Sequence, residues 1–166
     1  MADLIAVAID GTPAGQSALA LAGQQARKTR ARVAVLCTID AAYALKFHDG
    51  RISEEDETEY PAAAREELAA DQLVRDAVDR LRASGITAVG EILVGTPARA
   101  IVAAAKRLNA DMIVMGHRHL SWFDRMLHPS ICWDVLEHSI CPVLVSMAED
   151  DHSQAVAAIE KTPGAA

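Results

Sequence analysis

The chain has 166 residues, a length that suits one domain with a hydrophobic core and is short for two. Its formal net charge is −7 at neutral pH, so we expect no nonspecific binding to nucleic acid or to anionic membranes. Hydrophobic residues make up 51% of the sequence, yet no apolar run approaches the roughly 20 residues that a membrane span requires.

The amino-terminal segment and the cysteines indicate a reducing, cytoplasmic environment. The segment MADLIAVAID has no basic start and carries an acidic residue, so it does not resemble an export signal. Cys37, Cys132 and Cys141 are odd in number, scattered, and form no C-x-x-C pair. This pattern argues against a disulfide framework and against a cysteine zinc site. We therefore expect a cytoplasmic protein with reduced thiols.

Segments typical of strands and of helices alternate along the chain. Strands are predicted at about residues 4–9, 32–40, 86–94, 111–115 and 142–147. Helices are predicted at about residues 13–30, 61–84, 95–108 and 130–139. Residues 40–60 include an acidic run, and we expect them to form a mobile connection.

This order of elements predicts the fold class. Gly-Thr-Pro recurs at residues 11–13 and 95–97 and suits a helix start, because Thr can cap a helix and Pro fits its first position. Five strands that alternate with four helices predict a doubly wound α/β domain, in which helices cover both faces of a parallel sheet. We expect a single domain over residues 1–147, followed by a tail or short helix at 148–166.

The predicted fold places a ligand crevice beyond the carboxyl ends of the strands, where the strand order reverses. Asp10 follows the first strand and Gly116 ends the fourth, so a carboxylate would face a glycine turn if these strands are neighbours. Ser130 would begin the last helix, whose free N–H groups attract phosphate. Asp10 equally suits capping of the first helix, and the sequence leaves both roles open.

Several segments together resemble the universal stress protein family over about residues 3–147. They are AVAIDGTPAGQSALALA, the glycine turn and Pro97 in VGTPARAIVAAA, ADMIVMG, and the closing CPVLVS. The resemblance implies the strand order 3-2-1-4-5, which would put the strands that end at Asp10 and Gly116 side by side. It also implies a homodimer formed through the last strand, Pro142 to Met147, and, in one branch of the family, an ATP site.

The phosphate motif of that branch is only partly present. It consists of glycine, two residues, glycine, nine residues, glycine, and then serine or threonine. Gly116 and Ser130 match its ends, whereas His119 and Pro129 stand at the second and third glycines. Histidine adds a side chain, and proline removes an N–H donor. Losing one charge-assisted donor costs about 1.5 to 3 kcal/mol, so we expect ATP binding to be weak or absent.

Side chains in the same segment offer replacements for the lost donors. Residues 116–130 contain Arg118, Arg125, His117, His119 and His128, opposed only by Asp124. The histidines favour anion contact or a surface role over metal binding, since no acidic or cysteine partner is paired with them. The resemblance also implies that the backbone at Ile39 and Met115 brackets an adenine. Cys132 lies near a helix start, where we favour a buried inert thiol over a reactive one.

Two functional hypotheses follow. The first is a non-enzymatic stress-response homodimer that acts through protein partners and has no certain cofactor. The alternative is a sensor that binds ATP, AMP or another phosphorylated metabolite through Asp10, Ile39, Met115, Gly116, Arg118, His119 and Ser130. A slow nucleotide hydrolase is disfavoured, because the chain has no G-x-S-x-G or H-E-x-x-H motif and no acid clearly placed to activate water.

Overall fold

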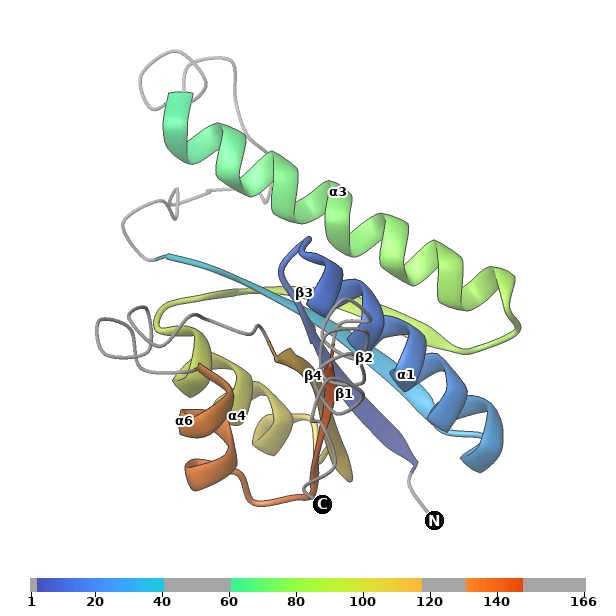
Figure 1. Cartoon of the computed structure of the whole chain (residues 1–166). Helices are drawn as coiled ribbons and strands as arrows, with labels where there is room; N and C mark the ends of the chain where they lie inside the picture. Colours follow the sequence, from blue (N-terminus) through green and yellow to red (C-terminus); the bar gives the residue numbers. More distant parts are fainter. Residues whose placement is uncertain (1–2, 41–60, 118–130, 148–166) are drawn as a thin grey trace, which may run out of the picture.

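The computed structural model describes residues 3–40, 61–117 and 131–147 (Figure 1). Apart from Asp40, the connection predicted near residues 40–60 lies outside these ranges, as does the tail predicted at 148–166. The strands are β1 (Leu4–Ile9), β2 (Arg32–Ile39), β3 (Ala88–Val94), β4 (Met112–His117) and β5 (Val143–Met147). The helices are α1 (Pro13–Thr29), α3 (Pro61–Ala83), α4 (Pro97–Arg107) and α6 (Ile131–His138).

The predicted strands and helices are all found, with small shifts at their ends. β3 begins at Ala88 rather than at residue 86, because the preceding residues close the end of α3. Gly85 has a left-handed backbone (φ 76°), and the N–H of Ile86 donates to the C=O of Leu81 at 3.1 Å. Such a bond satisfies a carbonyl that the helix leaves without a partner, so Ile86 belongs to the helix end.

The sheet has five parallel strands in the order β3-β2-β1-β4-β5, which confirms the predicted fold and strand order. β1 is central, and the order reverses between β1 and β4. Figure 1 shows α1 and α3 on one face of the sheet and α4 and α6 on the other. Each face carries its own apolar cluster, so every helix buries a stripe of small or aliphatic side chains against the strands.

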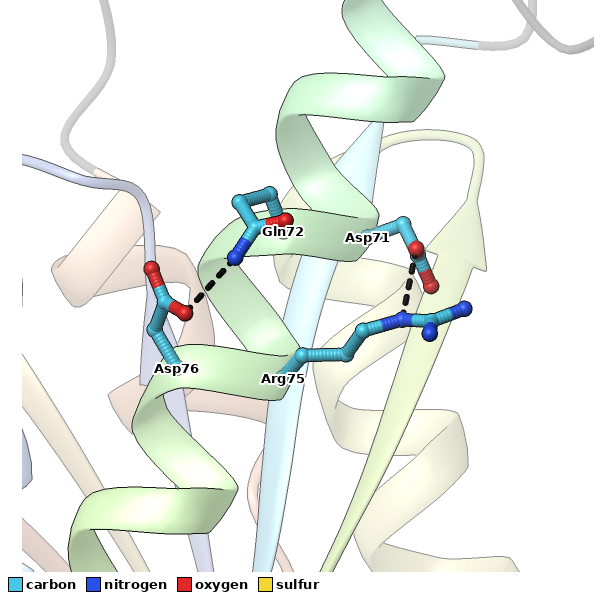
Figure 2. Close-up of polar contacts among 4 residues, drawn as sticks. All are labelled: Asp71, Gln72, Arg75 and Asp76. Atoms are coloured by element: carbon cyan, nitrogen blue, oxygen red, sulfur yellow. Dashed lines mark hydrogen bonds and ion pairs between the residues drawn. The ribbon is translucent and has the colours of Figure 1, made fainter.

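The long helix α3 is held by its buried stripe rather than by its polar surface. Val74, Ala77, Val78 and Leu81 are buried against the sheet. On the outer side, Figure 2 shows Arg75 paired with Asp71 and Gln72 paired with Asp76, at 2.7 Å each. Exposed pairs at this spacing contribute only about 0.3 to 0.5 kcal/mol each. No helix within the described ranges is both long and apolar enough to cross a membrane.

Candidate functional site

The candidate site lies where β1 and β4 end side by side. The two strands pair directly, with Ala8 opposite Met115, so Asp10 and Gly116 follow at the same edge of the sheet. The first turn of α1 begins at this edge as well. The structure therefore brings together the carboxylate, the glycine and a helix amino terminus, as the strand order required.

The Asp10 side chain folds back onto the turn that starts α1. Its Oδ1 accepts hydrogen bonds from the backbone N–H of Thr12 at 3.1 Å and from the Thr12 hydroxyl at 2.6 Å. Thr12 is the N-cap, and its Oγ1 accepts from the N–H of Gly15 at 3.3 Å. A Cβ at Gly15 would lie 2.6 Å from Asp10 Oδ1, so a glycine makes room for the carboxylate. Asp10 Oδ1 thus supports the helix cap, whereas Asp10 Oδ2 takes part in neither of the hydrogen bonds to Thr12.

Gly116 is required by packing and not by an unusual backbone angle. Positive φ angles among the described glycines occur at Gly11, Gly85 and Gly95. A Cβ at Gly116 would lie 2.2 Å from the carbonyl oxygen of Ala14 in α1, which no side chain can tolerate. The predicted turn at Gly116 is wrong, since β4 continues to His117, held by its pairing with Ser146 and Met147 of β5.

The backbone of Ile39 points away from the crevice. Its carbonyl accepts from the N–H of Gly95 at 3.1 Å, in line with the β2–β3 pairing. Successive residues of a parallel strand turn their backbone groups to opposite neighbours, so Thr38 faces the β1 side. β1 ends opposite Cys37, which leaves Thr38 beyond its end and beside the crevice. The sequence did not single out Thr38, because the register of the paired strands decides whether the backbone of Thr38 or of Ile39 faces β1.

Met115 is buried within β4, between Ala8 of β1 and Val145 of β5. Its side chain belongs to the cluster under α4 and α6, and its backbone faces β5, because the N–H of Ile113 two residues earlier donates to Pro142 and the pairing continues to Met147. The other proposed ligand contacts, Arg118, His119 and Ser130, lie outside the described residues. α6 begins at Ile131, one residue later than predicted.

Two carboxylates lie near Cys37 of β2. Burial, together with the nearby carboxylates of Asp10 and Glu66, raises the pKa of the Cys37 thiol to about 11. Burial also raises the pKa of Cys132, which supports the prediction of an inert thiol there. Among the described side chains, no group of three or more His, Cys, Asp or Glu residues is arranged to hold a metal ion.

Sequence comparison assigns the family. A model of the Universal stress protein family matches residues 1–146, almost all of the described sheet and its helices. The chain belongs to the universal stress protein family. A universal stress protein of Methanocaldococcus jannaschii is 39% identical over 61 residues. That match spans 37% of this chain and only about a third, 36%, of the relative.

Solved structures of the family share the fold. A universal stress protein in complex with cAMP is 27% identical, with a TM-score of 0.68, and the match covers 89% of this chain and 99% of that one. The universal stress protein of Archaeoglobus fulgidus in complex with dAMP is 25% identical, with a TM-score of 0.59. That match covers 86% of this chain and 95% of the other. The family and the nucleotide-binding-like α/β fold predicted from the sequence are thereby confirmed.

Replacing Gly116 with alanine tests the packing at the end of β4. We expect Gly116→Ala to lower the free energy of unfolding by about 1 to 3 kcal/mol or more, because the new methyl group meets the Ala14 carbonyl. Ser146→Ala, at the paired position on β5, is the control and should change stability by less than about 0.5 kcal/mol. Urea unfolding measures both, and equal stability of the two variants would contradict the assignment.

The three thiols should differ in reactivity. At pH 8 a thiol with a pKa of about 11 has a thiolate fraction about a hundredfold below that of an unperturbed cysteine, so Cys37 should resist alkylation. We expect iodoacetamide to label the half-buried Cys141 first, with Cys37 and Cys132 protected until the protein unfolds. Peptide mapping by mass spectrometry reads each site. Early labelling of Cys37 in folded protein would rule out the buried, electronegative environment.

Proposed function

We propose that this member of the universal stress protein family is a non-enzymatic homodimer of the cytoplasm that acts through protein partners and binds ATP weakly or not at all. The observation that supports this most directly is the apolar surface of α6. Trp133 is 69% exposed and Ile140, just after the helix, is 67% exposed, with Ile131 and Leu136 also exposed. Large apolar groups gathered on one helix are typical of a surface that contacts another protein.

The homodimer is proposed to form through β5, which has β4 as its only sheet neighbour within the described residues. The N–H of Ile113 donates to the C=O of Pro142 at 2.9 Å, and this register turns the backbone of Leu144 and Ser146 toward β4. The backbone groups of Val143, Val145 and Met147 then face the outer edge. An open edge of this kind pairs readily with the same strand of a second copy.

Weak ATP binding is supported by the charges and donors at the crevice. One oxygen of Asp10 is committed to Thr12, and Asp10 and Glu66 make the β1–β2 side electronegative. A triphosphate must therefore be held from the β4–α6 side. There the sequence has His119 and Pro129 at two positions where the ATP-binding motif has glycine. Gly116 gives no independent support for a phosphate site, since packing against Ala14 already requires it.

A second function, binding of an adenine nucleotide with one phosphate, is favoured by the two related structures solved with cAMP and dAMP. A monophosphate needs fewer donors than ATP, so the loss of two glycines harms it less. The proposed contacts are Asp10, Ile39, Met115, Gly116, Arg118, His119 and Ser130. Given the direction of the Ile39 carbonyl, we add Thr38 as the residue whose backbone would meet an adenine on the β2 side.

A cytoplasmic location is supported by three cysteines that are all free thiols, as expected in a reducing compartment. The absence of catalysis is a proposal that a phosphate-release assay with ATP tests directly. We also propose that residues 1–147 form the working domain, with a connection at 40–60 and a tail at 148–166.

A proline in the outer edge of β5 tests the dimer. Val145→Pro removes a donor that faces outward, and Leu144 before it is already extended, as a proline requires. We expect the wild-type chain to have a dimeric mass by light scattering at micromolar concentration. Val145→Pro should be monomeric, with its helix content retained in circular dichroism. Val145→Ile keeps the N–H and should remain dimeric. A monomeric wild-type chain would contradict the proposal.

Calorimetry with ATP, AMP and cAMP separates the two functions. We expect ATP to bind more weakly than cAMP or AMP, because its additional phosphates lack donors. Asp10→Asn keeps an acceptor for Thr12 but replaces the charged acceptor proposed for a ribose hydroxyl, so it should weaken binding of the nucleotide about tenfold to a hundredfold without unfolding α1. Asp79→Asn, on the exposed side of α3, is the control. Low-micromolar ATP binding would refute the first function, and no change in Asp10→Asn would refute the second.

A further inference from the structure

A second concave site lies at the opposite end of the sheet from Asp10. It is a cavity of about 270 Å³ at the amino ends of β2 and β3, between the carboxyl ends of α1 and α3. Both helices end on this side of the molecule in Figure 1. The cavity is lined by Ala26, Arg27, Arg30, Ala31, Arg32, Gly85, Ile86 and Thr87. Three of its eight lining residues are arginines, and none is acidic.

The three arginines are not neutralised by the ion pairs found in the described part of the chain. Those pairs join Arg75 to Asp71 and Arg107 to Glu91, both away from the cavity. The neighbouring Asp111 carboxylate is also engaged, since its Oδ2 accepts from two backbone N–H groups at the start of β1. In a chain with a net charge of −7, three arginines without an ion pair to another described residue line one cavity, which makes this part of the surface locally positive.

Arg30 occupies a backbone position that favours other residues. It ends α1 with φ 61° and ψ 26°, in the left-handed region. The corresponding positions after α3 and α4 are Gly85 and Asn109, the two residue types that accept this conformation most readily. Arginine does not favour the left-handed backbone conformation, so we attribute the presence of Arg30 at this position to its side chain.

Compensation of the helix dipole explains only part of this cluster. Arg27 and Lys28 lie in the last turn of α1, where basic residues are favoured in any helix. Arg30 and Arg32 follow the helix, and Arg32 belongs to β2. The carboxyl ends of α1 and α3 each add about half a negative charge here, which leaves the three arginines with an excess of positive charge. A ligand with several negative charges gains most from three guanidinium groups.

We propose that this cavity binds a small soluble ligand carrying two or more phosphate charges, such as a pyrophosphate group, through Arg27, Arg30 and Arg32. The volume suits a group of that size and not a full dinucleotide. A diphosphate presents oxygens to several guanidinium forks at once. The overall negative charge of the chain disfavours an anionic membrane surface as the source of these phosphates. The site is independent of the crevice at Asp10.

Calorimetry of the full chain with inorganic pyrophosphate tests the site. We expect binding that weakens as salt is raised and is lowered about tenfold for each guanidinium group removed in Arg27→Gln and Arg32→Gln. Arg30→Asn should lower affinity similarly while keeping or raising Tm, because asparagine suits the left-handed backbone. Lys28→Gln removes a neighbouring charge of α1 that does not line the cavity and should change affinity less than twofold.

Several outcomes would overturn the proposal. One is no binding of pyrophosphate to the wild-type chain at millimolar concentration. Another is unchanged affinity in the Arg27→Gln, Arg32→Gln double variant, which would place the anion elsewhere. Equal weakening by Lys28→Gln would show a diffuse charge effect, and binding only to phosphatidylglycerol vesicles would show a membrane source. Asp10→Asn distinguishes this site from the crevice, because it should leave pyrophosphate binding unchanged.

Discussion

The contact between the end of β4 and the first turn of α1 determines how the candidate site is arranged. The Ala14 carbonyl lies so close to Gly116 that a Cβ there would be 2.2 Å from its oxygen. The helix start is therefore held against β4, and its capped first turn stays at the strand edge. Gly15 leaves room for the Asp10 carboxylate in the same way. Two positions without side chains thus bring a strand end, a helix start and a carboxylate into one small region.

Because of this packing, the two roles considered for Asp10 do not exclude each other. Its Oδ1 accepts both hydrogen bonds from Thr12, and these bonds orient the whole carboxylate. A ligand hydroxyl would then meet a group that is already fixed, which lowers the entropic cost of binding. The same carboxylate opposes an anion through its charge. In the proposed nucleotide site, Asp10 would therefore suit the ribose better than the phosphates, which would need donors from the β4–α6 side.

The fold could be predicted from the sequence more fully than the site. Apolar runs and helix-start signals located every described strand and helix, because they reflect local periodicity. The strand order depended on resemblance to a family, since nothing local distinguishes β1 as the central strand. The packing role of Gly116 and the choice between Ile39 and Thr38 depend on register and on contacts between distant elements. The cavity at Arg27, Arg30 and Arg32 was not predicted, because basic residues are common at the carboxyl end of any helix.

The parallel α/β architecture explains why the two ends of this sheet differ in charge. Every helix follows a strand, so helix amino termini gather at one edge and carboxyl termini at the other. Basic residues in the last turns of α1, α3 and α4 compensate the negative ends of the helix dipoles at the edge where the carboxyl termini gather. Around α3 and α4 that charge is used within the fold, as Arg82 donates to the Ala88 carbonyl and Arg107 pairs with Glu91. At the end of α1 the positive charge of the arginines exceeds what the helix dipole requires. The arginines also line a cavity, and the two features together suit recognition of an anion.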